Sequence, residues 1–132
     1  MTVAVAHQHS PEGRAALLRA AAEAGSASTT LQVLHVFSGS PDPRAEEAER
    51  EAVTVLVRDT LDGARDVRWE LLSRRPGADT GATFVDLAEE SGAELLVLGS
   101  RRRSAVGKLL LGSTVQRILL DVPVPILLVK AP

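Results

Sequence analysis

The sequence predicts an α/β fold in which a five-stranded parallel sheet carries helices on both faces. Short apolar runs alternate with longer helical stretches along all 132 residues, and this βαβ order is typical of a parallel sheet. The length is that of one domain with its own core, so residues 1–132 are predicted to form a single domain. Apolar residues make up 45% of the chain, but with two Phe, one Trp and no Tyr the core must be aliphatic.

The individual elements follow from local signals along the chain. Thr2 to Ala6 is an apolar strand, and Ser10 followed by Pro11 supplies the N-cap and first residue of a helix that stops at Gly25. The other predicted strands are 31–37, 67–73, 95–98 and 124–129, and the other predicted helices are 44–62, 83–91 and 113–120.

Charges in the third strand predict the order of the strands. Arg68 and Glu70 alternate with apolar residues there, and burying unpaired ions in a central strand would cost several kcal/mol, so this strand belongs at an edge. This favours the order 3-2-1-4-5, in which the direction of winding reverses between strands one and four. Ligands of open α/β sheets bind outside the carboxyl ends of the strands at that point, which here means residues 7–10 and 99–113.

The loop that follows the fourth strand has features of an anion site. Gly99 allows the backbone to approach a ligand, and Gly112 precedes two hydroxyl residues at the start of a helix, whose free N–H groups attract phosphate. Arg101 and Arg102 add positive charge. The spacing is neither that of a Walker A loop nor that of a dinucleotide fingerprint.

This arrangement resembles the universal stress protein family over essentially the full chain. The resemblance rests on the element order, on the start of the first helix, on the Pro-rich last strand and above all on the loop. The family's ATP signature is Gly, two residues, Gly, nine residues, Gly, then Ser or Thr. Gly99, Gly112 and Ser113 match it at the right spacing, whereas Arg102 stands in place of the middle glycine.

The resemblance implies a Rossmann-like fold of the adenine nucleotide alpha hydrolase type and a pocket for ATP, with Mg²⁺ when ATP is bound. In ATP-binding members an acidic residue after the first strand holds the ribose, and Gln8 occupies that position here. Val36, after the second strand, would lie near the adenine. The residues that would contact the phosphates are Gly99, Arg101, Arg102, Gly112, Ser113 and Thr114.

Several functions remain open on this basis. The first is a stress-response regulatory module that binds ATP at the switch-point loop. Because Gln8 and Arg102 both depart from the family pattern, the second is a dimeric protein-interaction module whose degenerate pocket binds no nucleotide. A slow ATP hydrolase ranks last, since no catalytic residue or metal carboxylate is evident near the loop. The chain is therefore not expected to be an enzyme.

Composition argues against other classes of protein. A net charge of −2 and the scarcity of aromatic residues argue against nucleic-acid binding. No apolar run reaches the ~20 residues of a membrane span, no leader is apparent, and a cytoplasmic location is expected. His7, His9 and His35 could approach one another, but no carboxylate is evidently placed to complete a metal site, and the acidic stretch 46–51 is interpreted as a solvated helix face.

The last strand indicates a partner. Residues 124–129 are apolar on both faces although the strand lies at an edge of the predicted sheet, and an uncovered apolar edge promotes aggregation. A second copy that pairs through Val124, Ile126 and Leu128 would cover this edge, and universal stress proteins similarly dimerise through this strand. Other protein partners are unknown.

Overall fold

The computed structural model describes residues 1–63, 66–101 and 111–131 and confirms the predicted parallel sheet. The strand order is β3-β2-β1-β4-β5, and every neighbouring pair is parallel. The strands are β1 (Val3–Ala6), β2 (Leu31–Val36), β3 (Trp69–Arg74), β4 (Leu95–Ser100) and β5 (Ile126–Lys130). The helices are α1 (Pro11–Ser26), α2 (Pro43–Leu61), α3 (Thr80–Ser91) and α4 (Ser113–Asp121).

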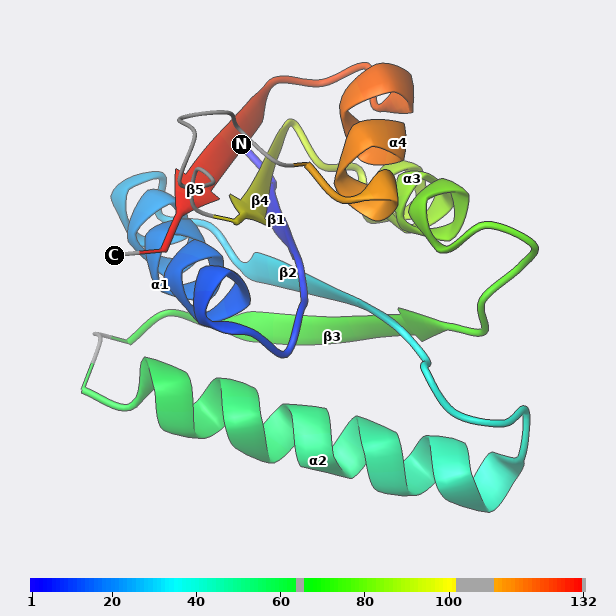
Figure 1. The fold of residues 1–132 in the computed structure, drawn as a ribbon. Coiled ribbons are helices and arrows are strands. Elements are labelled where there is room, and N and C mark those ends of the chain that lie inside the picture. Colours follow the sequence, from blue (N-terminus) through cyan, green and yellow to red (C-terminus); the bar gives the residue numbers. More distant parts are fainter. Residues whose placement is uncertain (64–65, 102–110, 132) are drawn as a thin grey trace.

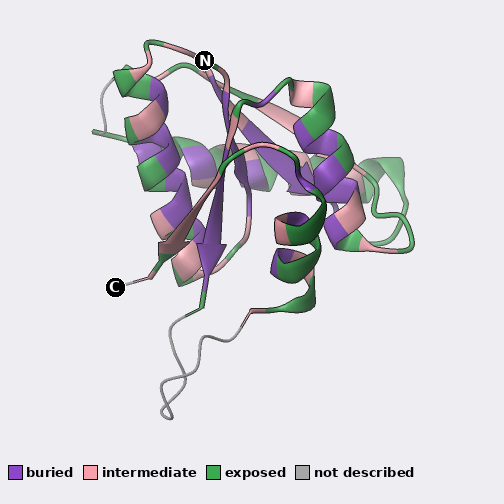
Figure 2. Cartoon of the chain, turned by 90° about the horizontal axis from the view of Figure 1, so that it is seen from above, coloured by how far each residue is buried: buried purple, intermediate pink, exposed green. Residues whose placement is uncertain are grey.

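Helices cover both faces of the sheet, as Figure 1 shows. Alternate residues of β1 point to opposite faces, so Val3 and Val5 pack against α1 and α2, whereas Ala4 and Ala6 pack on the side of α3 and α4. The central strands are buried between the two helical layers (Figure 2). Buried Leu, Val, Ala and Ile side chains form both halves of the core, with Phe37 and Phe84 as the buried aromatic residues.

The third strand lies at an edge of the sheet, as the charge pattern predicted. The Glu70 side chain is exposed and accepts a hydrogen bond from Gln32 on β2 at 3.3 Å. Arg68 lies just before the strand, where its carbonyl accepts from the Leu31 N–H at 2.8 Å. Neither charge is buried, which removes the desolvation cost that a central position would carry.

Helix α3 and strand β4 extend beyond their predicted ends, whereas β3 and β5 each begin two residues later than predicted, at Trp69 and Ile126. Helix α3 begins at Thr80 rather than Thr83, because Asp79 accepts hydrogen bonds from the Gly81 and Ala82 N–H groups. Strand β4 continues to Ser100 instead of ending before Gly99, because Gly99 and Ser100 still pair with β5.

The predicted helix stops were correct at two glycines and wrong at one. Gly63 and Gly92 have left-handed φ angles of 77° and 69° just beyond α2 and α3. Gly25, by contrast, lies inside α1, which ends one residue later at Ser26.

Candidate functional site

A pocket of about 330 Å³ opens at the carboxyl ends of β1 and β4, the predicted switch point of the sheet. Its walls are the turn from β1 into α1, the end of β4 and the first turn of α4. The lining residues are Gln8, His9, Ser10, Glu12, Gly99, Ser100, Arg101, Leu111, Gly112, Ser113, Thr114 and Val115.

Gly99 is required by the packing of the chain itself. A Cβ atom at this position would lie 2.4 Å from the Glu12 carbonyl oxygen and 3.1 Å from the Gly13 nitrogen. Gly13 is equally constrained, since its own Cβ would lie 1.9 Å from the Gln8 carbonyl oxygen. Gly99 lets the start of α1 pack against the end of β4, and Gly13 lets it pack against the turn from β1, so the main walls of the pocket lie close together.

Gly112 has no such role among the described residues. Its φ of −65° suits any residue, and a Cβ there would meet nothing within 4 Å. The position faces open space at the start of α4, where a small residue leaves room for a ligand to approach the helix.

Helix α4 also differs from the other helices at its N-terminus. Ser10, Asp42 and Asp79 cap α1, α2 and α3 with side-chain oxygens. No side chain of the described residues caps α4, whose N-cap is Gly112. The first N–H groups of a helix carry a partial positive charge and are a ready binding site for an anion when left uncapped.

Two buried polar atoms in the same walls lack a partner. Gln8 Oε1 and Ser100 Oγ make no hydrogen bond within the part of the chain that the structure describes. The Ser100 side chain is particularly informative, because the residue is only 1% exposed. Buried polar groups are nearly always paired, so both atoms are suited to a ligand or an ordered water.

The pocket brings together six of the residues predicted for the nucleotide site. They are Gln8, Gly99, Arg101, Gly112, Ser113 and Thr114. Val36 does not line the pocket, because it is 7% exposed and its side chain packs in the core on the side of α3 and α4. Arg102 lies outside the described residues.

Two lining residues, Ser100 and Glu12, were not among the residues predicted to contact a nucleotide, although Ser100 lies within the predicted ligand-binding stretch 99–113. Ser100 follows Gly99 at the end of a strand, and this position alone could have suggested it. Glu12 and Arg101 both line the pocket, so it contains both signs of charge.

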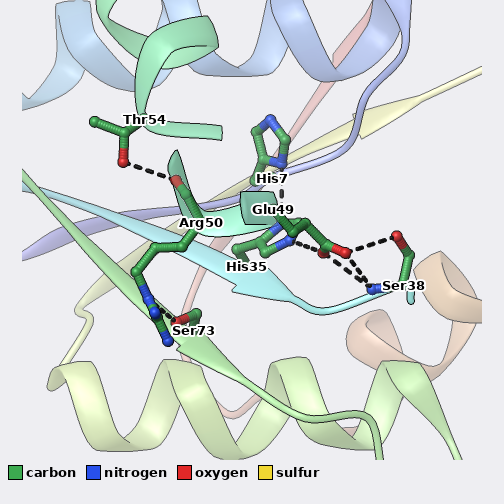
Figure 3. Close-up of polar contacts among 7 residues, drawn as sticks. All are labelled: His7, His35, Ser38, Glu49, Arg50, Thr54 and Ser73. Atoms are coloured by element: carbon green, nitrogen blue, oxygen red, sulfur yellow. Dashed lines mark hydrogen bonds and ion pairs between the residues drawn. The ribbon is translucent and has the colours of Figure 1, made fainter. Parts of the chain in front are cut away.

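Two of the three histidines lie in contact, and a carboxylate joins them. His7 and His35 point toward each other with their Nδ1 atoms 3.2 Å apart, and Glu49 of α2 reaches His35 Nε2 at 2.5 Å (Figure 3). His9 is exposed and does not complete a metal-binding group with His7, His35 and Glu49. Among the described residues, no group of three or more His, Cys, Asp or Glu side chains could hold a metal ion.

The interpretation of residues 46–51 as a solvated face is wrong for Glu49. Its carboxylate accepts from His35 and from the Ser38 N–H at 3.0 Å. Burial raises the pKa of Glu49, but these hydrogen bonds outweigh it and hold the pKa below its ordinary value. Glu46 departs from a solvated face as well, since its side chain is only 11% exposed and pairs with Arg75, whereas the exposed Glu47 pairs with Arg50.

Within the described ranges no helix is long and apolar enough to cross a membrane.

Comparison with known proteins shows one consistent likeness. The model of the universal stress protein family matches residues 1–130. A universal stress protein of Mycolicibacterium smegmatis is 37% identical over 129 residues, which cover 97% of this chain and 96% of that protein.

Solved structures share the fold at lower identity. A universal stress protein from Archaeoglobus fulgidus in complex with dAMP has a TM-score of 0.71 and 20% identity, with 98% of each chain covered. A universal stress protein in complex with cAMP has a TM-score of 0.74 and 22% identity, covering 100% of this chain and 98% of its own.

Proposed function

The chain belongs to the universal stress protein family, and we propose that it is a stress-response regulatory module that binds an adenine nucleotide, ATP with Mg²⁺, at the ends of β1 and β4. The observation that carries this proposal is the uncapped start of α4 beside the unpartnered, buried Ser100 hydroxyl. An anion that carries hydrogen-bond acceptors satisfies both at once: its oxygens accept from the helix N–H groups and from Ser100 Oγ.

Different residues of the pocket would contact the phosphates, the ribose and the base of the nucleotide. The phosphates would lie against the first turn of α4, where Ser113 and Thr114 add hydroxyl donors and Arg101 adds positive charge. Gln8 Oε1 would accept from a ribose hydroxyl, although a neutral amide accepts less strongly than a carboxylate. A contact between the base and Val36 would have to come from the main chain, because the Val36 side chain lies in the core.

The nucleotides in related structures support the same class of ligand. The relatives that share this fold include complexes with dAMP and with cAMP. Both ligands combine an adenine with a single phosphate, so they fit a site with one uncapped helix start.

Isothermal titration with Mg-ATP, with AMP in parallel, tests the proposal. We expect Gly112→Val to weaken ATP binding by about tenfold or more, equivalent to about 1.4 kcal/mol, because its side chain fills the space before α4. The control is Gly25→Val, at the far end of α1, where a Cβ makes only ordinary contact with Val67 at 3.6 Å.

The absence of both heat and a shift in melting temperature with the wild-type protein would refute nucleotide binding. The second candidate function, a protein-interaction module with a closed pocket, would then stand. Gln8 in place of a carboxylate is the observation that favours it.

The homodimer is also a proposal, and the position of β5 supports it. The strand lies at the edge of the sheet, and Ile126, Leu128 and the preceding Val124 are only partly buried. Pairing with a second copy would cover these side chains and the unpaired backbone of the edge. The cytoplasmic location and the single-domain organisation stay predictions from the sequence.

A further inference from the structure

A second pocket lies on the other side of the turn from β1 into α1, between α1 and α2. Its volume is about 460 Å³, within the range of small-molecule sites. Leu17 of α1 and Leu56 of α2 supply apolar walls, and His7 lies at the end of β1. The start of α4 takes no part in this pocket, so it is separate from the proposed phosphate site.

His7 is the unusual member of the lining. The residue is 8% exposed, and one ring nitrogen, Nδ1, is engaged with His35. The other, Nε2, has no hydrogen-bond partner among the residues that the structure describes, and in Figure 3 it points away from His35. The His7 ring is thus more than nine-tenths buried, lines a pocket whose surface is mostly apolar, and carries one unpaired nitrogen.

The contacts behind His7 determine which proton each ring carries. The Glu49 carboxylate can only accept, so His35 Nε2 donates to it across 2.5 Å. When both rings are neutral, His35 Nδ1 carries a lone pair and can only accept. The 3.2 Å hydrogen bond between the two Nδ1 atoms then requires that His7 Nδ1 carries the proton and donates it. His7 Nε2 is left as an acceptor.

Burial keeps His7 in this neutral form. Desolvation, together with the neighbouring His35 and His9, lowers the pKa of His7 to about 4, against a weaker opposing effect of Glu49. The charged or titratable groups around the ring are therefore His9 in the turn, His35 on β2, Glu49 on α2 and Arg14 at the pocket on α1.

We propose that the pocket between α1 and α2 is a binding site for a small neutral molecule that has an apolar body and one hydroxyl or N–H group, which donates to His7 Nε2. Leu17 and Leu56 would enclose the apolar body, and the hydrogen bond would fix its orientation. Phenol is the simplest compound of this class. This inference does not depend on nucleotide binding, because it uses neither Gly112 nor α4.

The tautomer of His7 gives the first test, on the full chain. Long-range ¹H–¹⁵N correlation spectra at pH 7 should show Nδ1 protonated and Nε2 unprotonated. Protonation at Nε2 would overturn the proposal, because the pocket would then present a donor.

Titration with phenol and anisole gives the second test, followed through the backbone amide signals of Gly13 and Leu17. Anisole has the same ring but no donor, and we expect it to bind about tenfold more weakly or worse, since it leaves His7 Nε2 unpaired. Anisole binding as tight as phenol binding, or no phenol binding up to its solubility limit, would contradict the proposal.

A pair of variants on α2 locates the binding. Leu56→Trp fills the pocket from a partly buried position and should abolish phenol binding, whereas Val55→Trp, at its exposed neighbour, should leave it unchanged. Both variants keep His7, His35 and Glu49. Phenol shifts that persist in Leu56→Trp would place the ligand elsewhere. Mg-ATP binding by the same variant would show separately whether the nucleotide proposal holds.

Discussion

Gly99 and Gly112 are both part of the family signature, but the structure gives them different physical roles. Gly99 lies against the backbone of α1, so the chain requires a glycine there whether or not a ligand binds. Gly112 has an ordinary φ, and no described residue lies near its Cβ position, so the contacts of the described residues give no reason for a glycine there. Spacing in the sequence could locate both residues but could not separate these roles, because they depend on contacts with residues far away in the chain.

Alanine at the two glycines should therefore affect stability very differently. In Gly99→Ala the new Cβ would clash with the Glu12 carbonyl, and we expect a loss of about 2–4 kcal/mol in the free energy of unfolding. In Gly112→Ala the loss should stay within about 1 kcal/mol. Urea unfolding measures both values, and equal losses would contradict this account.

His7 should make stability depend on pH in a defined window. The pKa of His7 is lowered from 6.5 in the unfolded chain to about 4 in the fold, so the unfolded state binds the extra proton first. Stability from this group is complete above pH 6.5, falls as the pH drops toward 4 and levels off below it, for a total of about 3 kcal/mol.

Urea unfolding midpoints between pH 7.5 and about 4.5 measure how steeply the free energy of unfolding changes with pH. The slope should be largely absent in His7→Asn and only slightly reduced in His9→Asn, because His9 makes a minor contribution to the lowered pKa of His7. An equal slope in the wild type and in His7→Asn would show that other groups cause it.

At the scale of elements, local signals predicted the existence and type of every helix and strand. The edge position of β3 followed from two charges, because a parallel sheet has few places for them. The ends were less predictable: β4 runs past Gly99 because of its pairing with β5, a contact that local sequence does not specify. The attachment of α2 was missed for the same reason, since Glu49 and His35 are 14 residues apart on different elements.

Glu49 should matter more for the attachment of α2 than the exposed Glu47. Glu49→Ala leaves the partly buried His35 Nε2–H unpaired, and we expect a loss of about 1–3 kcal/mol in unfolding free energy. Glu47→Ala removes only an exposed pair with Arg50 and should change stability by about 0.5 kcal/mol or less. Equal losses of stability for the two variants in thermal or urea unfolding would show that the Glu49–His35 contact stabilises the fold no more than the exposed Glu47–Arg50 pair.

For the candidate site, the sequence predicted the position of the pocket in the fold better than the residues that line it. The reversal of strand order located the pocket, and the glycine spacing located the start of α4. The sequence did not reveal Ser100 as an unpartnered hydroxyl, nor that the Val36 side chain faces the core. Both facts depend on how far β4 extends and on which face of β2 each residue occupies.

At the scale of the whole molecule, the edge formed by β5 should determine the oligomeric state. Val124→Lys would place a charge from each copy in the interface of the proposed dimer, and we expect its dissociation constant to rise about tenfold or more. Leu120→Lys, at a side chain that is 80% exposed on α4, should leave the dimer intact.

Sedimentation velocity at micromolar concentration distinguishes these outcomes, with circular dichroism to confirm that both variants fold. A wild-type protein that sediments only as a monomer would remove the dimer from the proposal.

Residues 8–10 form a wall of both pockets, one on each side of the same short turn. Thermodynamic linkage places a strict condition on two ligands bound to such a shared wall: the factor by which one changes the affinity for the other is the same in both directions. A titration of Mg-ATP at saturating phenol and the reverse titration must therefore give one coupling free energy, whose sign states whether the two occupants cooperate or compete.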